Sequence, residues 1–176
     1  MLKTKKRIWT LGHSTRTLDE FMDLLKADDI QHLIDVRRFP GSRKFPQFNL
    51  ENLQSAVVAQ GLLYTHLETL GGRRKASQDS KNTIWNHPSF RGYADYMETT
   101  DFKEAYINLE VLASKKRAAI MCSEAVWWRC HRSMISDQLK ANGWEVIHIL
   151  GPDQHQEHPY TKPAQIKNGK LFYHSN

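Results

Sequence analysis

The sequence predicts an α/β fold with a mostly parallel, open sheet and helices on both faces, as in Rossmann-like three-layer proteins. Two observations predict it. Short apolar runs alternate along the chain with segments of helical apolar spacing, which is typical of β-α-β units. A chain of 176 residues is also long enough for one domain with a single core. We therefore expect one α/β domain over residues 1–176, with residues 152–176 as a tail or hairpin packed on it.

Strands are expected where short apolar runs end in turn or polar residues. The loop 37–49, which follows the second of them, contains two prolines and Gly41, and these exclude a regular helix there. The expected strands are residues 7–11, 33–36, 62–67, 118–121 and 146–150.

Helices are expected where apolar residues recur every three to four positions. The capping box Thr17-Leu18-Asp19-Glu20 begins the first one, and Gly61 and Gly143 are typical C-terminal caps. The expected helices are residues 18–25, 50–57, 90–98, 102–113 and 131–142.

Two further segments carry turn signals. Residues 75–88 are polar and rich in turn formers, which predicts a surface loop that could act as a lid. Near the end of the chain, Asn168-Gly169 lies between two short alternating runs within residues 164–173, which predicts a type I′ hairpin.

Composition limits the class of protein. A formal net charge of +6 and a pI near 9.3 favour anionic partners such as nucleic acid, nucleotides or phosphorylated metabolites. No apolar run approaches a membrane span, and the basic residues 1–6 lead into a stretch too short for a signal peptide. We expect a cytoplasmic protein without a membrane partner. Cys122 and Cys130 are the only cysteines, so a disulfide scaffold is not expected.

Polar motifs follow four of the expected strands. Because the carboxyl ends of parallel strands meet at one edge of a sheet, these motifs should line one cleft, where open α/β folds bind ligands. The motifs are Gly12–Ser14, Asp35–Arg38, His66–Glu68 with Gly71–Arg74, and Cys122–Glu124.

Arginine is concentrated in the segments that should meet. A single loop arginine is usually solvated, but several guanidiniums in one cleft predict a clamp for phosphate or carboxylate. The free amides and the dipole at the start of the helix near Cys130 would also favour an anion. The predicted substrate-binding residues are Ser14, Arg16, Arg37, Arg38, Arg43, Arg73, Cys130, His131 and Arg132.

Three residues are predicted to handle protons: Glu124, Asp35 and His13. Glu124 lies two residues beyond Cys122 and could act as a general acid or base. For each of the three a structural role is an equal or stronger alternative. Both carboxylates could form ion pairs with arginine, and a buried histidine is more often a hydrogen-bonded core residue.

The two thiols should differ. Cys122 is expected to be a small buried residue at a strand end, whereas Cys130 lies at a helix start among Arg129, His131 and Arg132, which favour the thiolate. The spacing is wrong for the phosphate loop of cysteine phosphatases. We predict no metal site, because Cys-x7-Cys-His lacks a familiar second ligand pair and His13 or His66 would have to complete it.

Of Trp127 and Trp128, one should pack in the core and the other could stack on a base.

The motifs together resemble the signature blocks of the family called domain of unknown function 488. The resemblance runs in order from about residue 7 to residue 151 and implies a cytosolic α/β domain of prokaryotic type, with no particular reaction. Its blocks are Gly12–Thr17, Asp35–Pro40 with Ser42-Arg43 and Pro46–Phe48, Leu70–Arg73, Cys122–Glu124 and Cys130–Arg132.

The leading functional hypothesis is an enzyme that acts on a phosphate-bearing substrate, a nucleotide or nucleic acid, in an arginine-rich cleft by hydrolysis or group transfer. No cofactor fingerprint occurs, and no cofactor is predicted. One alternative is a non-catalytic nucleic-acid-binding module whose arginines track phosphates. Another is a thiol or metal protein that uses Cys122, Cys130 and His131.

Overall fold

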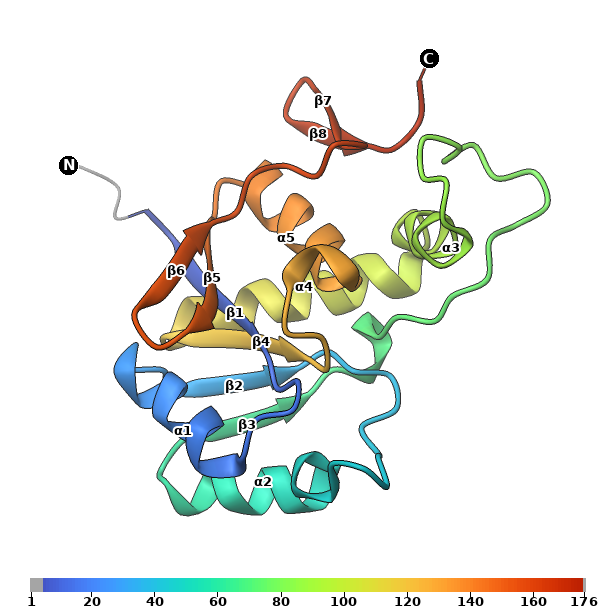
Figure 1. The fold of residues 1–176 in the computed structure, drawn as a ribbon. Coiled ribbons are helices and arrows are strands. Elements are labelled where there is room, and N and C mark those ends of the chain that lie inside the picture. Colours follow the sequence, from blue (N-terminus) through green and yellow to red (C-terminus); the bar gives the residue numbers. More distant parts are fainter. Residues whose placement is uncertain (1–4, 176) are drawn as a thin grey trace.

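The computed structural model describes residues 5–175. Its central sheet has six strands, in the order β3-β2-β4-β1-β5-β6 (Figure 1). These strands are β1 (Arg7–Gly12), β2 (His32–Asp35), β3 (Leu63–His66), β4 (Ala118–Cys122), β5 (Glu145–Gly151) and β6 (Gln154–Glu157). The first five pair in parallel, and β6 pairs antiparallel with β5.

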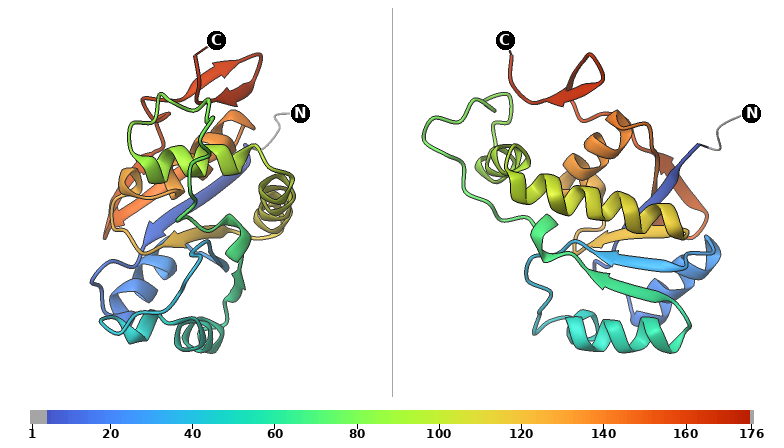
Figure 2. Two further views of the ribbon diagram at one scale, coloured as in Figure 1. Left: turned by 90° about the vertical axis from the view of Figure 1, so that its right-hand side faces the viewer. Right: turned by 180° about the vertical axis from the view of Figure 1, so that it is seen from behind.

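Helices cover both faces of this sheet (Figure 2). They are α1 (Leu18–Ala27), α2 (Leu50–Ala59), α3 (Pro88–Met97), α4 (Thr100–Lys115) and α5 (Arg132–Ala141). Three single 3-10 turns, η1 (Pro46–Phe48), η2 (Glu68–Leu70) and η3 (Trp127–Arg129), lie in the loops. The three-layer α/β fold is therefore confirmed.

The two layers of helices have separate apolar cores, because successive strand residues point to opposite faces. On one face, α1 and α2 pack on Trp9, Leu33 and Met121. On the other face, α3, α4 and α5 pack on Ile8 and Ile120 together with other inward residues of the sheet. Strands buried on both sides are apolar at nearly every position, which is why short apolar runs located them.

Local signals placed most element ends correctly. The capping box of α1 is present, with Thr17 Oγ1 accepting from the Glu20 amide and Glu20 accepting from the Thr17 amide. The predicted hairpin consists of β7 (Gln165–Lys167) and β8 (Lys170–Phe172). Asn168 and Gly169 at its turn have φ values of 51° and 73°, as a type I′ turn requires.

Strand β6 was not predicted from the sequence. Its sequence, Gln154–Glu157, is entirely polar because it is an edge strand that faces solvent, so it carries no apolar pattern. Gln156 has a specific partner, since its Oε1 accepts a hydrogen bond of 2.9 Å from Trp127 Nε1.

The tail after β6 is held to α5 by a buried polar network, which we call the Asp137 cluster. Asp137 Oδ1 accepts from His158 Nε2 and from the Thr161 amide, and Oδ2 accepts from Thr161 Oγ1 and from Tyr173 OH at 2.7 Å. His158 Nδ1 lies 2.8 Å from His148 Nε2. The last partner is Thr10, whose Oγ1 lies 2.5 Å from His148 Nδ1.

The hydrogen bonds of this cluster run in one direction. A carboxylate only accepts, so His158 Nε2 carries a hydrogen, His158 Nδ1 accepts from His148 Nε2, and His148 Nδ1 accepts from Thr10. Every ring nitrogen then has a partner. Burial, followed by the neighbouring His158 and Arg132, lowers the pKa of His148 to about 2, in agreement with a neutral ring.

The loop predicted over residues 75–88 contains no helix or strand before α3 begins. Asp95 on α3 fixes its conformation, accepting hydrogen bonds from the Ser77 amide, Ser80 Oγ and Asn82 Nδ2. A lid role for this loop stays a prediction. Within residues 5–175, no helix is both long and apolar enough to cross a membrane.

Candidate functional site

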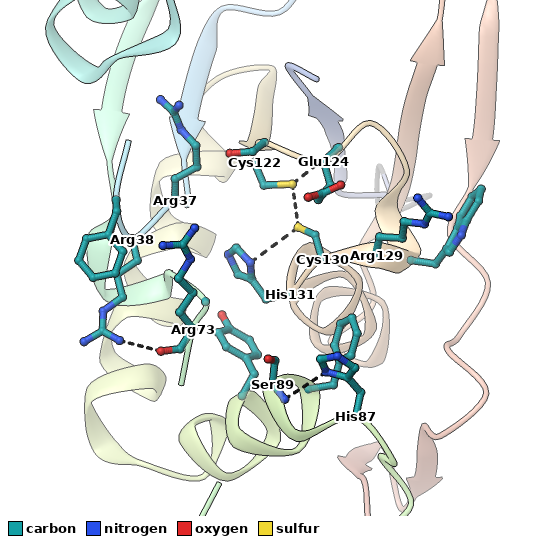
Figure 3. A pocket seen from close by; sticks show the side chains of 16 residues that line it. Arg37, Arg38, Arg73, His87, Ser89, Cys122, Glu124, Arg129, Cys130 and His131 are labelled. Atoms are coloured by element: carbon teal, nitrogen blue, oxygen red, sulfur yellow. Dashed lines mark hydrogen bonds between the residues drawn. The ribbon is translucent and has the colours of Figure 1, made fainter. Parts of the chain in front are cut away.

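A pocket of about 650 Å³ lies at the carboxyl edge of the sheet, where the segments that follow β2, β3 and β4 meet. Its walls come from residues 37–39, from Gly72 and Arg73, from residues 122–131 and from the start of α3 (Figure 3). The helices after β1 and β2 pack on one face of the sheet, and the helix after β4 packs on the other. The connections therefore diverge above Cys122, the position where open α/β folds bind ligands.

Four arginines line this pocket, namely Arg37, Arg38, Arg73 and Arg129. Among the described residues 5–175, Glu124 is the single carboxylate in its lining. The pocket is therefore cationic.

Arg38 and Arg73 are held against each other at one side of the pocket. Arg38 Nη1 donates a hydrogen bond of 2.9 Å to the carbonyl of Arg73 (Figure 3). Arg73 itself has φ of 58°, a left-handed conformation that is uncommon for a residue with a side chain. Such strained residues cluster at ligand sites. Arg73 lines the pocket with an exposed side chain.

Asp35 orients Arg37 and does not line the pocket. Arg37 Nη2 donates to Asp35 Oδ2 at 2.6 Å, and Arg37 Nε donates to Oδ1 at 2.9 Å. The Arg37 amide also donates to Oδ1, and Tyr64 OH donates to Oδ2 at 2.7 Å. This buried carboxylate therefore has its acceptor sites filled, and its geometry fits a positioning role better than proton transfer.

Cys122 and Cys130 lie side by side in the pocket wall. Their Sγ atoms are 2.7 Å apart, and both thiols are free and buried (Figure 3). Cys122 is the last residue of β4, and Cys130 precedes α5, so the loop between them brings the two sulfurs together.

The two thiols have opposite electrostatic environments. Burial raises the pKa of Cys122 well above its ordinary value, and the hydrogen bond with Cys130 raises it further. Burial would also raise the pKa of Cys130, but the hydrogen bond with Cys122, the charge of Arg132 and the Arg132 amide outweigh it and lower that pKa. Cys130 is therefore the more acidic thiol of the pair and Cys122 the less acidic one.

His131 presents its basic nitrogen to Cys130. Its Nε2 lies 2.8 Å from the carbonyl of Val36, which can only accept, so Nε2 carries a hydrogen. Nδ1 lies 3.7 Å from Cys130 Sγ. Burial lowers the pKa of His131, which keeps Nδ1 unprotonated at neutral pH. A Cβ on Gly72 would lie 2.9 Å from this Nδ1, so a side chain at position 72 would collide with the His131 ring.

Arg132 is a buried cation that lacks a carboxylate partner within residues 5–175. Its side chain is almost completely buried, and Nη2 donates to the carbonyls of Glu124 and Ala125. Its Nε and Nη1 atoms have no hydrogen-bond partner in the described part of the chain. An unpaired buried cation is costly, and it favours the ionised form of a thiol near it. The charge of Arg132 thus contributes to the lowered pKa of Cys130.

The predicted site residues fall into two groups. Arg37, Arg38, Arg73, Glu124, Cys130 and His131 line the pocket. Asp35 and Arg132 lie buried beneath it, while His13, Ser14, Arg16 and Arg43 lie outside its lining.

Three residues of the second group, His13, Ser14 and Arg16, lie in the segment after β1. The Ser14 amide donates to the Ser123 carbonyl at 2.9 Å, which ties this segment to the loop after β4. Arg16 turns away and donates to the carbonyls of Gly12 and Leu150. The His13 ring stacks on Phe48 with ring centres 4.3 Å apart, and burial lowers its pKa.

The first amide of α5 has a different partner from the anion expected there. The Arg132 amide donates to Cys130 Sγ at 3.3 Å, so this amide stabilises the thiolate. Trp127 is buried and Trp128 is 52% exposed in the pocket lining, which confirms that the two tryptophans divide between core and surface.

Sequence reasoning missed the contribution of α3 to the pocket. His87, Ser89, Phe90 and Tyr93 line it, and Tyr93 OH donates to the Leu70 carbonyl at 2.6 Å. No local motif marks these residues. Helix α3 does not directly follow a strand, and only the tertiary fold brings it to the pocket. The cysteines, His131 and the arginines carried the useful signal.

The described residues 5–175 contain no group of three histidine, cysteine or acidic side chains placed to hold a metal ion. The geometry therefore gives the metal form of the thiol alternative no support.

The model of a protein family described as Domain of unknown function DUF488 matches residues 17–139. This range includes β2, β3, β4 and the start of α5, and with them every segment that lines the pocket. Searches of curated proteins and of solved structures gave no match.

Proposed function

The chain belongs to the family Domain of unknown function DUF488; because membership assigns no reaction, we propose from the geometry of the pocket that the protein is an enzyme acting on a phosphate-bearing substrate. The substrate is a nucleotide or a nucleic-acid end, and the reaction is group transfer or hydrolysis. The observation that carries this proposal is a concave site that combines four arginines with Cys130, His131 and Glu124.

The arginines supply the anion site. Arg37 is pre-oriented by its ion pair with Asp35, and Arg38 by its hydrogen bond to the Arg73 carbonyl, so these two side chains lose little entropy when a ligand binds. Planar guanidiniums bind phosphate oxygens in pairs. A net positive pocket with fixed donors favours a doubly charged phosphate over a neutral ligand.

The remaining lining fits the other parts of a nucleotide and its chemistry. The exposed ring of Trp128 offers a stacking surface for a base. His131 Nδ1 and the Glu124 carboxylate are the groups able to take or give a proton inside the pocket. Asp35 and His13, which were also predicted for this role, lie outside the pocket lining, where Asp35 pairs with Arg37 and His13 stacks on Phe48.

A second candidate function, a non-catalytic nucleic-acid-binding module, uses the same arginines and Trp128. Salt dependence separates the two. A polymer that lies across many basic side chains releases several counterions and loses affinity with a log–log slope of about 0.9 per phosphate neutralised. A mononucleotide held in the pocket has a shallower slope.

The test is a calorimetric titration of the wild type with inorganic phosphate, mononucleotides and short single and double strands at two salt concentrations. Arg73→Ala should weaken binding by roughly tenfold, since it removes a charge-assisted contact. Arg7→Ala is the matched control. Arg7 carries the same charge, but it pairs with Glu145 at the amino ends of the strands, away from the pocket at their carboxyl ends. Equal binding by all three proteins, or no binding at all, would contradict the proposal.

Glu124→Gln then distinguishes an enzyme from a binding module. An enzyme that uses Glu124 keeps its ligand and loses turnover. A binding module binds the anion as well or more tightly, because a negative charge has been removed from the pocket, and it has no turnover to lose.

A further inference from the structure

We infer that Cys122 and Cys130 form a redox-active dithiol, in which Cys130 attacks the sulfur of an anionic disulfide in the arginine pocket and Cys122 resolves the product. This inference rests on the proposed function, because it places the reacting sulfur of the substrate above the same arginines. It goes further by naming the nucleophile, the second thiol and the class of reaction.

The arrangement of the two sulfurs is the first argument. They are 2.7 Å apart, and a disulfide needs a separation of about 2.05 Å, so bond formation requires only a small movement. The two residues come from different elements, the end of β4 and the start of α5, and both line the pocket. A nucleophile that only transferred a group would not need a second thiol in contact with it.

The buried Arg132 is the second and independent argument. Two of its nitrogens have no partner within residues 5–175, and the described chain gives it no carboxylate. A guanidinium is always charged, so the fold keeps a buried cation beside the two thiols, where its charge lowers the pKa of Cys130. A structural role would favour an apolar residue here, whereas a reactive thiolate needs the cation.

The thiols are also unequal in the way that the reaction requires. The attacking sulfur should be a thiolate, and the resolving sulfur should stay protonated until a mixed disulfide has formed. Cys130 accepts a hydrogen bond from the Arg132 amide and faces His131 Nδ1, whereas Cys122 donates toward the Glu124 carbonyl at 3.7 Å.

The first step forms a covalent intermediate. The Cys130 thiolate attacks one sulfur of the substrate disulfide, the substrate S–S bond breaks, and one half leaves as a thiolate. The other half remains joined to Cys130 as a mixed disulfide, with its phosphate or carboxylate held by Arg38 and Arg73.

The second step releases this half. Cys122 gives its proton to His131 Nδ1 and attacks Cys130 Sγ, which forms the Cys122–Cys130 disulfide and expels the bound thiolate. That thiolate takes the proton from His131. The substrate gains two electrons and the protein pair loses two, and an external dithiol reductant restores the two thiols.

Three disulfides of different charge test the inference. The reduced protein is incubated with coenzyme A disulfide, which carries phosphates, with the neutral bis(2-hydroxyethyl) disulfide, and with the cationic cystamine. Intact-mass and peptide mass spectrometry then follow the products. The wild type should lose two hydrogens and gain a cross-link between the peptides of Cys122 and Cys130, with the phosphate-bearing probe about tenfold faster than the neutral one because of charge-assisted binding.

Two matched variants assign the roles. Cys122→Ser should accumulate a mixed disulfide on Cys130, because nothing resolves it, whereas Cys130→Ser should form no adduct. Both positions are buried, so circular dichroism checks the fold of each variant. The wild-type cross-link is a readout that does not depend on the variants.

The outcomes separate this inference from the proposed function. If the protein binds phosphate or nucleotides but the wild type forms no cross-link and Cys122→Ser no adduct, the dithiol is wrong and the anion pocket stands. If both products form but the three probes react at equal rates, also in Arg73→Ala, the dithiol stands and the anion pocket is wrong. An adduct on Cys122 in Cys130→Ser at the wild-type rate would reverse the assigned roles and overturn the inference.

Discussion

Two buried polar clusters lie along the same helix, α5, and they differ in how completely their hydrogen bonds are made. We call Cys122, Cys130, His131 and Arg132 the thiol cluster. In the Asp137 cluster the carboxylate accepts four hydrogen bonds, and each ring nitrogen of His148 and His158 has a partner. In the thiol cluster, two nitrogens of Arg132 have none within residues 5–175.

Under the proposed function, the difference separates polar groups that serve the fold from polar groups that serve a ligand. Buried polar groups are normally hydrogen-bonded, and a complete network makes one conformation rigid. The Asp137 cluster does this when it ties the tail to α5. The thiol cluster instead keeps two unpartnered donor nitrogens of Arg132 beside a pocket, which costs stability.

The largest expected effect is the loss of stability when the Asp137 cluster is broken. Asp137→Ala leaves the buried His158, Thr161 and Tyr173 without their common acceptor. The free energy of unfolding, measured by urea denaturation, should fall by about 3 kcal/mol or more. Asp23→Ala, at an exposed position of α1, is the control and should change it by no more than about 0.5 kcal/mol. Equal losses of unfolding free energy in the two variants would contradict a stabilising role of the Asp137 cluster.

Acid should weaken the same cluster. The pKa of His148 is lowered to about 2 in the folded state, against an unfolded value near 6.5, so below pH 6.5 the unfolded chain binds the additional proton. Its contribution to stability is complete above pH 6.5 and is lost as the pH falls toward 2, by at most about 1.4 kcal/mol per pH unit. Urea denaturation of wild type and His148→Gln between pH 7 and pH 4 measures it; the variant should have the shallower slope, and identical slopes would contradict the neutral ring.

Arg132→Met should have a small effect on stability and a large effect on thiol reactivity, unlike Asp137→Ala. It removes a buried cation with two unpartnered nitrogens and conserves much of the volume, so the free energy of unfolding should fall by less than about 1 kcal/mol. The pKa of Cys130 should rise, because Arg132 helps to lower it, and alkylation of Cys130 at pH 7 should slow roughly tenfold.

The control for that experiment is Arg129→Met, which removes an exposed guanidinium next to Cys130. Peptide mapping follows Cys122 and Cys130 separately as the pH is raised, and Cys130 should react at the lower pH in the wild type. A large loss of stability in Arg132→Met with unchanged alkylation would make Arg132 a structural residue.

The smallest expected effect concerns the backbone at the pocket. In Gly72→Ala the new Cβ would lie 2.9 Å from His131 Nδ1 and displace the ring from Cys130, whereas a Cβ on Gly41 meets nothing within 4 Å. Alkylation of Cys130 should change a few-fold in Gly72→Ala, with a stability loss of about 1 kcal/mol. Gly41→Ala should match the wild type in both measurements, and the same result for Gly72→Ala would show that the His131 position is unimportant.

The same contrast explains what the sequence could predict. Strand ends carry local signals, so the placement of Arg37, Arg73 and Glu124 at one edge followed from the apolar runs before them. The Asp137 cluster draws on residues 10, 137, 148, 158, 161 and 173, and no local spacing relates them. Only the tertiary fold brings these side chains together.

The direction in which a strand-end side chain points could not be predicted from the sequence either. Arg16 and Arg73 both follow strands, yet Arg16 turns back to the carbonyls of Gly12 and Leu150 while Arg73 faces the pocket. Strand order decides which loops adjoin, and β4 lies between β1 and β2, so the loop after β4 separates the segment after β1 from the pocket. Strand β6 was missed for a simpler reason, because an exposed edge strand needs no apolar residues.

The most direct test of the central claim, that the arginine pocket binds a phosphate-bearing ligand over the thiol cluster, is ligand protection of Cys130. The rate of Cys130 alkylation is measured by peptide mapping in the wild type, Arg73→Ala and Arg7→Ala, each with and without inorganic phosphate or a nucleoside triphosphate. At least one of these anions should slow the reaction severalfold in the wild type and in Arg7→Ala, and much less in Arg73→Ala at the same concentration. An alkylation rate in the wild type that neither anion changes would contradict the claim.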